Sequence, residues 1–119
     1  MNVTIYQYPG CSTCKKALKW LADTDHDITS IDIVKSPPST ETLQRLARQT
    51  THPLKKFFNV AGQSYRNGGF KDRLATMSEF EQFAALAADG KLIKRPLVDF
   101  GTKTLIGFKP VEWDEALGT

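Results

Sequence analysis

The stretch VTIYQYPGCSTC, residues 3–14, decides the fold of this chain. Its first half is rich in β-branched and aromatic residues and stops at Pro9-Gly10, which predicts a strand over 3–8 that ends in a turn. After the turn, apolar residues recur over 14–21 at the spacing of one helix face. A second strand is expected over 28–34. Strand, helix and strand in this order are typical of a βαβ unit, in which the strands are parallel.

Helices are expected in the middle of the chain. Ser39 is a candidate N-cap for a helix that would carry Leu43 and Leu46, and a short helix is expected after Pro53. The glycine-rich residues 62–69 are expected to form a loop.

The segment SEFE at 78–81 has the pattern of a capping box at the start of a further helix. Phe80 and Phe83 follow at helical spacing, and both are expected in the core. Gly90 is expected to be the C-terminal cap of this helix.

The last part of the chain changes character again. The segments 97–100 and 104–108 flank Gly101-Thr102-Lys103 and predict a β-hairpin. Pro110 is expected in the first turn of a final helix, since proline is favoured there. That helix would hold Val111, Trp113 and Leu117.

The element order predicts an α/β protein with a mixed sheet of about four strands, flanking helices, and a helical insertion over about 39–90 between the second and third strands. A thioredoxin-like fold satisfies this order. At 119 residues the chain is expected to form one domain over 1–119.

Composition excludes several classes of function. The 16 basic and 13 acidic residues give a net charge of +3, which is too small an excess to predict nucleic-acid binding. No apolar run approaches the roughly 18–20 residues that span a membrane, and no secretory signal precedes Gly10. We therefore expect a cytoplasmic protein that contacts neither nucleic acid nor membrane directly.

Cys11 and Cys14 are the candidate functional residues. In a reducing compartment, such a pair is more often catalytic, redox-sensing or metal-binding than structural. A thiol attacks only as thiolate, and the start of a helix together with nearby Lys15 and Lys16 favours that form at Cys11. Cys14 lies on the apolar helix face and is expected to be buried. We therefore predict that Cys11 attacks and that Cys14 resolves the adduct.

Two other interpretations of the pair stay open. A CxxC pair can be half of a zinc site, but the chain has no second pair, and His26 and His52 do not have a zinc-finger spacing. No metal is therefore expected. Cys14 could alternatively be an inert, buried small residue.

Arg95-Pro96 is the second candidate element. Arginine offers several N–H donors to an oxyanion, and Arg95 precedes a strand that would pair near the first. A proline at the start of a strand can hold a cis bond. The alternative is a solvated arginine beside an ordinary loop proline.

Taken together, the CxxC pair, Pro37-Pro38 and the segment LIKRPL at 92–97 resemble the ArsC-like family. This family comprises glutaredoxin-linked arsenate reductases, Spx/MgsR-type regulators and many small thiol proteins. The resemblance runs from about residue 3 to residue 113. It is strongest to bacterial members that combine a CxxC pair with KKFFN, here at 55–59, and Tyr65-Arg66.

The resemblance implies a thioredoxin-like fold, a bacterial cytoplasmic setting and Cys11 as the redox nucleophile. It further implies that Arg95 binds an oxyanion or a sulfenate near Cys11, and that Pro96 occupies the cis-proline position. Arsenate reductases of this type use a single cysteine with several arginines. Only Arg95 matches here, because the other arginine positions fall near Asn59 and Gly107.

The sequence and the resemblance together predict an arsenate reductase-like thiol–disulfide oxidoreductase that uses Cys11, Cys14 and Arg95. Its substrate would be a disulfide, a glutathione adduct or an oxyanion such as arsenate. No bound cofactor is expected, and glutathione with glutaredoxin, or thioredoxin, would be the external reductant. The residues expected to bind the substrate are Ser12, Thr13, Lys15 and Pro96.

The alternative function is an Spx-like redox-sensing transcriptional regulator that binds the α subunit of RNA polymerase. The glycine that such regulators use for this contact is replaced here around Thr50 or Thr51.

Overall fold

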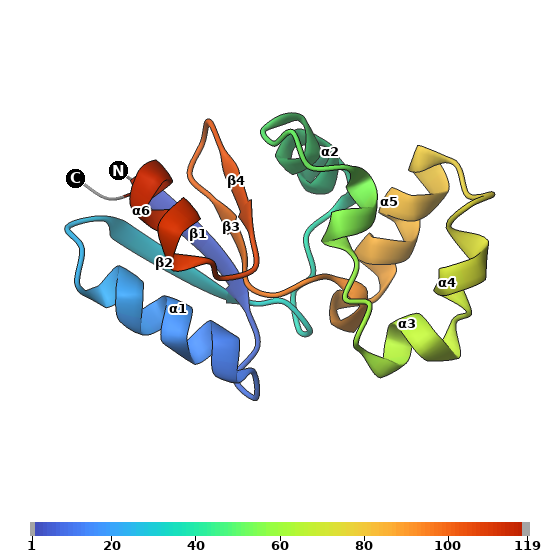
Figure 1. The fold of residues 1–119 in the computed structure, drawn as a ribbon, viewed down its shortest axis with the longest axis horizontal. Coiled ribbons are helices and arrows are strands. Elements are labelled where there is room, and N and C mark those ends of the chain that lie inside the picture. Colours follow the sequence, from blue (N-terminus) through green and yellow to red (C-terminus); the bar gives the residue numbers. More distant parts are fainter. Residues whose placement is uncertain (1, 118–119) are drawn as a thin grey trace.

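A four-stranded mixed sheet carries helices on both faces (Figure 1). The computed structural model describes residues 2–117. The spatial order of the strands is β2-β1-β3-β4, with β1 at Asn2–Gln7, β2 at Asp27–Asp32, β3 at Leu97–Asp99 and β4 at Thr104–Ile106. β1 is parallel to β2 and antiparallel to β3, which is antiparallel to β4. The predicted mixed sheet is therefore confirmed.

The predicted βαβ unit is present, but its second strand ends earlier than expected. Asp32 ends β2 because its side-chain Oδ1 accepts the backbone N–H groups of Val34 at 2.9 Å and Lys35 at 3.1 Å. Aspartate commonly turns the chain in this way. Ile33 still donates its N–H to the Gln7 carbonyl at 2.8 Å, so contact with β1 continues one residue past the strand.

One face of the sheet is covered by α1 (Ser12–Ala22) and α6 (Pro110–Leu117). The two helices meet through an edge-to-face pair of Trp20 and Trp113, whose ring centroids are 5.5 Å apart. Trp113 is fully buried, and its indole N–H donates to the Gly107 carbonyl at 3.1 Å. Val111, by contrast, is exposed. The side chain of Leu117 lies outside the described part of the chain.

The opposite face packs against the helical insertion, which occupies the right-hand part of Figure 1. The insertion consists of α2 (Thr40–Arg48), the 3-10 turn η1 (Leu54–Phe57), α3 (Gln63–Asn67), α4 (Phe70–Arg73), α5 (Glu79–Ala88) and the 3-10 turn η2 (Gly90–Leu92). Its core residues Leu46, Phe57 and Leu86 pack together with Tyr6 and Ile33 from the sheet side. The sheet therefore has a separate hydrophobic core on each face.

Residues 62–69 do not form the predicted loop, because α3 occupies most of this segment. The Tyr65 ring stacks on Phe70 at 6.1 Å and meets Phe58 edge-on at 6.4 Å. This tertiary packing stabilises a short helix, although the glycines in the segment do not favour helix formation.

The prediction that Phe80 is a core residue is wrong, since its side chain is 72% exposed. The prediction for Phe83 is confirmed, since Phe83 is buried together with Leu86. Each step of three residues moves the side chain by about 60° around an α-helix, so Phe80 lies about 120° away from the buried Leu86.

The capping box of Ser78 and Glu81 is confirmed, but Gly90 is not the C-cap. α5 ends at Ala88 with Asp89 as its C-cap, and Gly90 starts η2 in a buried position. A Cβ added to Gly90 would overlap the carbonyl oxygen of Ile33. The glycine therefore permits a close approach between two backbone segments.

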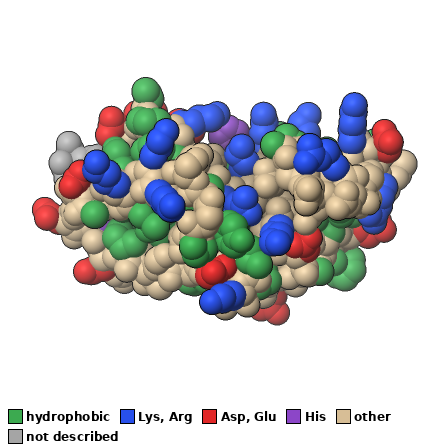
Figure 2. All heavy atoms as spheres, turned by 90° about the horizontal axis from the view of Figure 1, so that it is seen from below, with side chains coloured by type: hydrophobic (Ala, Val, Ile, Leu, Met, Phe, Trp, Pro, Cys, Tyr) green, Lys and Arg blue, Asp and Glu red, His purple; other side chains and the backbone are tan. Residues whose placement is uncertain are grey.

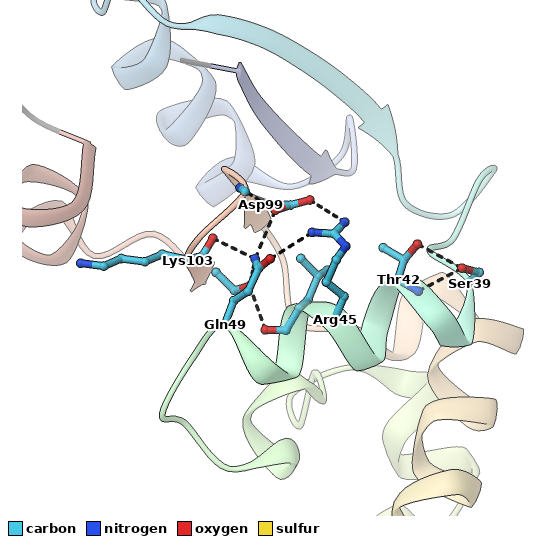
Figure 3. A network of polar contacts seen from close by, with 9 residues as sticks. Ser39, Thr42, Arg45, Gln49, Asp99 and Lys103 are labelled. Atoms are coloured by element: carbon cyan, nitrogen blue, oxygen red, sulfur yellow. Dashed lines mark hydrogen bonds and ion pairs between the residues drawn. The ribbon is translucent and has the colours of Figure 1, made fainter.

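A polar network connects α2 to the hairpin of β3 and β4 (Figure 3). The Arg45 guanidinium donates to Asp99 at 2.8 Å, and the Gln49 amide donates to Asp99 at 3.2 Å and to Thr104 Oγ1 at 3.2 Å. The Thr104 hydroxyl in turn donates to the Leu46 carbonyl at 2.8 Å. These hydrogen bonds connect the helical insertion to the β3–β4 hairpin of the sheet.

Candidate functional site

Cys11 lies in the turn between β1 and α1, where the sequence places it. Its backbone N–H donates to the Tyr8 carbonyl at 3.0 Å, which closes the turn. Cys11 is the N-cap of α1, and its Sγ accepts the backbone N–H of Cys14 at 3.2 Å. The sulfur therefore satisfies one of the N–H groups that a helix start leaves unpaired. The residue is partly exposed.

Cys14 lies one helical turn further on and is fully buried, so its predicted burial is confirmed. Both cysteines are free thiols, and the Cys14 thiol hydrogen-bonds to the Cys11 sulfur. Burial, together with that hydrogen bond and the nearby Cys11, raises the pKa of Cys14 to about 12. Cys14 is therefore a thiol at neutral pH.

The pKa of Cys11 shifts the opposite way. Partial burial acts to raise the pKa of Cys11, but hydrogen bonds from the Cys14 thiol and backbone, and the charge and hydrogen bond of Arg95, outweigh it and lower the pKa below its ordinary value. The two thiols are thus differentiated: the accessible Cys11 is the more acidic, and the buried Cys14 keeps its proton. This is the pattern of an attacking sulfur with a second sulfur behind it.

Arg95 reaches Cys11 because of the pairing of β1 with β3. In this antiparallel pair Tyr6 lies opposite Leu97. Two residues after Tyr6 and two residues before Leu97, the same pairing direction brings Tyr8 towards Arg95. The Arg95 guanidinium carbon lies 5.0 Å from the centroid of the Tyr8 ring. The Arg95–Pro96 peptide bond is cis.

Tyr8 is the residue of this site that the sequence analysis missed. Besides contacting Arg95, its ring lies against Gly10, where an added Cβ would come within 3.0 Å of it. An aromatic residue at the end of a predicted strand carries no signal of such a contact, because its partner is more than eighty residues away in the sequence.

The four residues predicted to bind substrate differ in exposure. Ser12, Thr13 and Lys15 are exposed on the first turn of α1, beside Cys11, whereas Pro96 is buried. The positive charge that lowers the pKa of Cys11 comes from Arg95, which lies on a distant segment, and not from the expected lysines Lys15 and Lys16 of the helix itself. Substrate binding by these residues stays a prediction.

Among residues 2–117, no group of three or more His, Cys, Asp or Glu side chains is placed to hold a metal ion. Within the same range, no helix has both the length and the apolar character needed to cross a membrane.

Comparison with known proteins gives consistent matches over almost the whole chain. The sequence model of the ArsC family matches residues 6–116. The uncharacterised protein YusI of Bacillus subtilis is 47% identical over 115 residues, which are 97% of this chain and 98% of YusI. Regulatory protein MgsR of Bacillus subtilis is 26% identical over 111 residues, covering 93% of this chain and 86% of MgsR.

The crystal structure of a possible arsenate reductase from Streptococcus mutans is also similar. It is 42% identical, with a TM-score of 0.88 over 97% of this chain and 98% of that one. Solved structures of ArsC-family proteins have a thioredoxin-like fold, and the predicted fold is therefore confirmed.

Proposed function

The chain belongs to the ArsC family, and with that membership as the premise we propose that it is a thiol–disulfide oxidoreductase in which Cys11 attacks and Cys14 resolves. One observation carries this proposal above the others. The accessible Cys11 sulfur, whose pKa is lowered, receives hydrogen bonds from the helix start and from Arg95, and the Cys14 thiol lies in contact behind it.

The proposed reaction begins with the Cys11 thiolate. It attacks one sulfur of a disulfide or a glutathione adduct, so that a mixed disulfide forms and the other sulfur leaves as a thiolate. Cys14 then gives up its proton to solvent or to the leaving group and attacks Cys11. This second step forms the Cys11–Cys14 disulfide and releases the reduced substrate thiol.

The cysteine pair loses one electron pair in each cycle, and the substrate disulfide gains it. A new cycle therefore needs an external thiol reductant. Glutathione with glutaredoxin, or thioredoxin, is the proposed class, and no bound cofactor is required. Since Cys14 has a pKa of about 12, its attack is slow unless its proton is accepted as the mixed disulfide forms.

Arg95 would orient the negatively charged part of the substrate beside Cys11. Arsenate is the less favoured substrate in this proposal. The positions that the resemblance assigns to further arginines fall near Asn59 and near the buried Gly107, and neither of these residues supplies a cation. An oxyanion with more than one charge would rely on Arg95 and the helix start.

The first experiment measures the acidity of Cys11. The rate of Cys11 alkylation by iodoacetamide is followed against pH, with mass spectrometry of the peptides separating Cys11 from Cys14. We expect an apparent pKa for Cys11 below the ordinary value of about 8.5. An apparent pKa at or above that value contradicts nucleophilic use of Cys11.

The second experiment measures turnover of a mixed disulfide with glutathione and glutaredoxin, or with thioredoxin, as the reductant. Cys11→Ser is expected to abolish reduction, whereas Cys14→Ser is expected to accumulate the mixed disulfide on Cys11. Turnover that survives in both variants contradicts the proposed site.

A redox-sensing regulator is the second candidate, and the similarity to MgsR favours it. In this case the Cys11–Cys14 pair would change the affinity for RNA polymerase rather than turn over substrate. Binding of the oxidised and the reduced protein to purified RNA polymerase α subunit separates the two functions. Redox-dependent binding without reductase turnover supports the regulator.

A further inference from the structure

A groove of about 760 Å³ lies between the helical insertion and the end of the sheet. Leu54, Lys55 and Lys56 of η1 border it on one side, and Ile106 of β4 and Lys109 border it on the other. The volume is within the usual range of ligand-binding pockets. The groove is therefore large enough to hold a ligand.

The groove is strongly basic. The lysines that line it are Lys55, Lys56, Lys71, Lys94 and Lys109, and His52 also borders it, whereas Glu79 is the acidic residue of the lining. Figure 2 shows Lys and Arg side chains gathered along the upper edge of the molecule, from the middle to the right of that view. The concentration of positive charge at this groove exceeds what the net charge of +3 would suggest.

The floor of the groove is apolar and rests on a buried aromatic cluster. Phe58 forms an antiparallel bridge with Ile93, and its ring packs with Tyr65 and Phe70 at centroid distances of 6.4 and 5.8 Å. Val60, a further lining residue, leaves 59% of its surface exposed. The groove thus combines an apolar floor with a cationic rim.

The groove is connected to the thiol site through the backbone segment Lys94-Arg95. Lys94 lines the groove, and the next residue is Arg95, whose guanidinium hydrogen-bonds to the Cys11 sulfur. The Lys94 N–H donates to the Phe57 carbonyl at 2.7 Å, which fixes this segment to η1.

We propose that the groove binds an acidic segment of a protein, with alternating carboxylate and apolar side chains, and that this segment belongs to the protein whose disulfide the Cys11–Cys14 pair reduces. This inference rests on the proposed function. Carboxylates of the segment would lie against the lysine rim, while its apolar side chains would cover Val60 and the partly exposed Leu54 and Ile106. The groove would then select substrates, and Cys11 would carry out the exchange.

The chemistry of the lining favours a peptide over other anions. Lysine is a flexible point charge, which suits several dispersed carboxylates better than one small oxyanion, for which the planar fork of arginine is the usual choice. A nucleic acid would need many phosphate contacts to bind, and the net charge of +3 provides little long-range attraction to such a polymer. The apolar floor has no use in binding a phosphate backbone.

The test uses a short fluorescein-labelled peptide in which Glu and Leu alternate, and its fluorescence anisotropy is measured against the full-length protein carrying Cys11→Ser. We expect binding that weakens as salt is added. The double variant Lys71→Gln/Lys94→Gln, which removes charge from two walls of the groove, is expected to weaken binding about tenfold. Both lysines are exposed, so the fold is expected to persist.

The matched control is Lys35→Gln/Lys103→Gln, which removes the same charge from exposed lysines outside the groove. Its affinity for the peptide should remain close to that of the parent. Equal weakening in both double variants overturns the groove as the binding site. Equal binding of a peptide with Lys in place of each Glu, or tighter binding of a single-stranded oligonucleotide or of glutathione alone, overturns the acidic segment as its occupant.

A separate measurement with the wild-type thiols distinguishes this inference from the proposed function. The rate at which Cys11 reacts with a disulfide of the acidic peptide is compared with its rate towards the neutral reagent dithiodipyridine. The groove variant should slow only the first reaction. If Cys11 proves unreactive towards both reagents while the peptide still binds, the proposed function fails and the binding site stands.

Discussion

At the scale of single residues, the contact of Tyr8 with Arg95 leads to a test of how the thiol site is held together. If the Tyr8 ring positions the guanidinium, Tyr8→Leu should let Arg95 move away from Cys11 and raise the pKa of Cys11 towards its ordinary value. Tyr8→Phe keeps the ring and should leave the pKa almost unchanged. The measurement is the pH dependence of Cys11 alkylation.

The control for this prediction is Arg95→Gln, which removes the guanidinium directly. Its effect on the Cys11 pKa should equal or exceed that of Tyr8→Leu, and the two changes combined should add little, because both act through one group. Additive effects of the two substitutions, or the same pKa in Tyr8→Leu and wild type, contradict the positioning role of Tyr8.

The single residues also show what the sequence can predict about the site. The burial of Cys14 follows from helix periodicity alone, since Cys14, Ala17 and Leu21 occupy one face. The meeting of Tyr8 and Arg95 depends on the register of β1 with β3, which local patterns do not specify. The burial of Cys14 was therefore predictable from the sequence, and the contact between Tyr8 and Arg95 was not.

At the scale of elements, substitution of Gly90 tests how closely η2 must approach the segment that follows β2. Gly90→Ala is expected to destabilise the protein by more than about 2 kcal/mol, because the added Cβ overlaps the Ile33 backbone and one of the two segments must move. Urea unfolding followed by circular dichroism measures the loss.

The matched control for that substitution is Gly101→Ala. Gly101 has a φ of 93° and no atom within 4 Å of an added Cβ, so only the conformational cost of roughly 1 kcal/mol is expected. An equal loss in both variants would contradict the prediction, because Gly90 has no positive φ and its substitution is expected to cost stability through the close approach to Ile33.

The helical insertion shows why element-level prediction succeeds in part. The capping box at Ser78 fixes the start of α5 locally, and it was predicted correctly. Which face of α5 is buried depends on where α2 packs against it. This packing buries the face that carries Leu86 and leaves Phe80 exposed. The Gly-rich segment forms α3 for the same reason, since Tyr65 packs against Phe58 and Phe70, which lie outside that segment.

At the scale of the whole molecule, the two hydrophobic cores lie on opposite faces of one sheet, and a polar network ties the insertion to the hairpin. Asp99 is central to this network. Burial acts to raise the pKa of Asp99, but hydrogen bonds from Arg45, from the Gly101 N–H and from Gln49 outweigh it and lower the pKa. The carboxylate form is therefore the one that stabilises the folded state.

This sign gives a pH-dependent prediction. Because the pKa of Asp99 is lower in the folded protein than in the unfolded chain, its contribution is fully present above the ordinary aspartate pKa and is lost as the pH falls through the lowered value. Asp99→Asn should therefore cost about 1–3 kcal/mol at neutral pH, through the lost hydrogen bonds to a charged group, and less in acid. The Arg45 side chain is 44% exposed, so the ion pair by itself adds little.

Urea unfolding of Asp99→Asn and wild type at neutral and acidic pH measures this difference, and Asp114→Asn on the exposed side of α6 is the matched control. The control removes the same charge from the molecule, so any general effect of net charge appears in both variants. A stability difference that grows as the pH falls, or one that is equal in the two variants, would show that the Asp99 network does not carry the connection between insertion and sheet. A difference that is confined to Asp99→Asn and shrinks in acid would show that this connection depends on the charged form of one carboxylate.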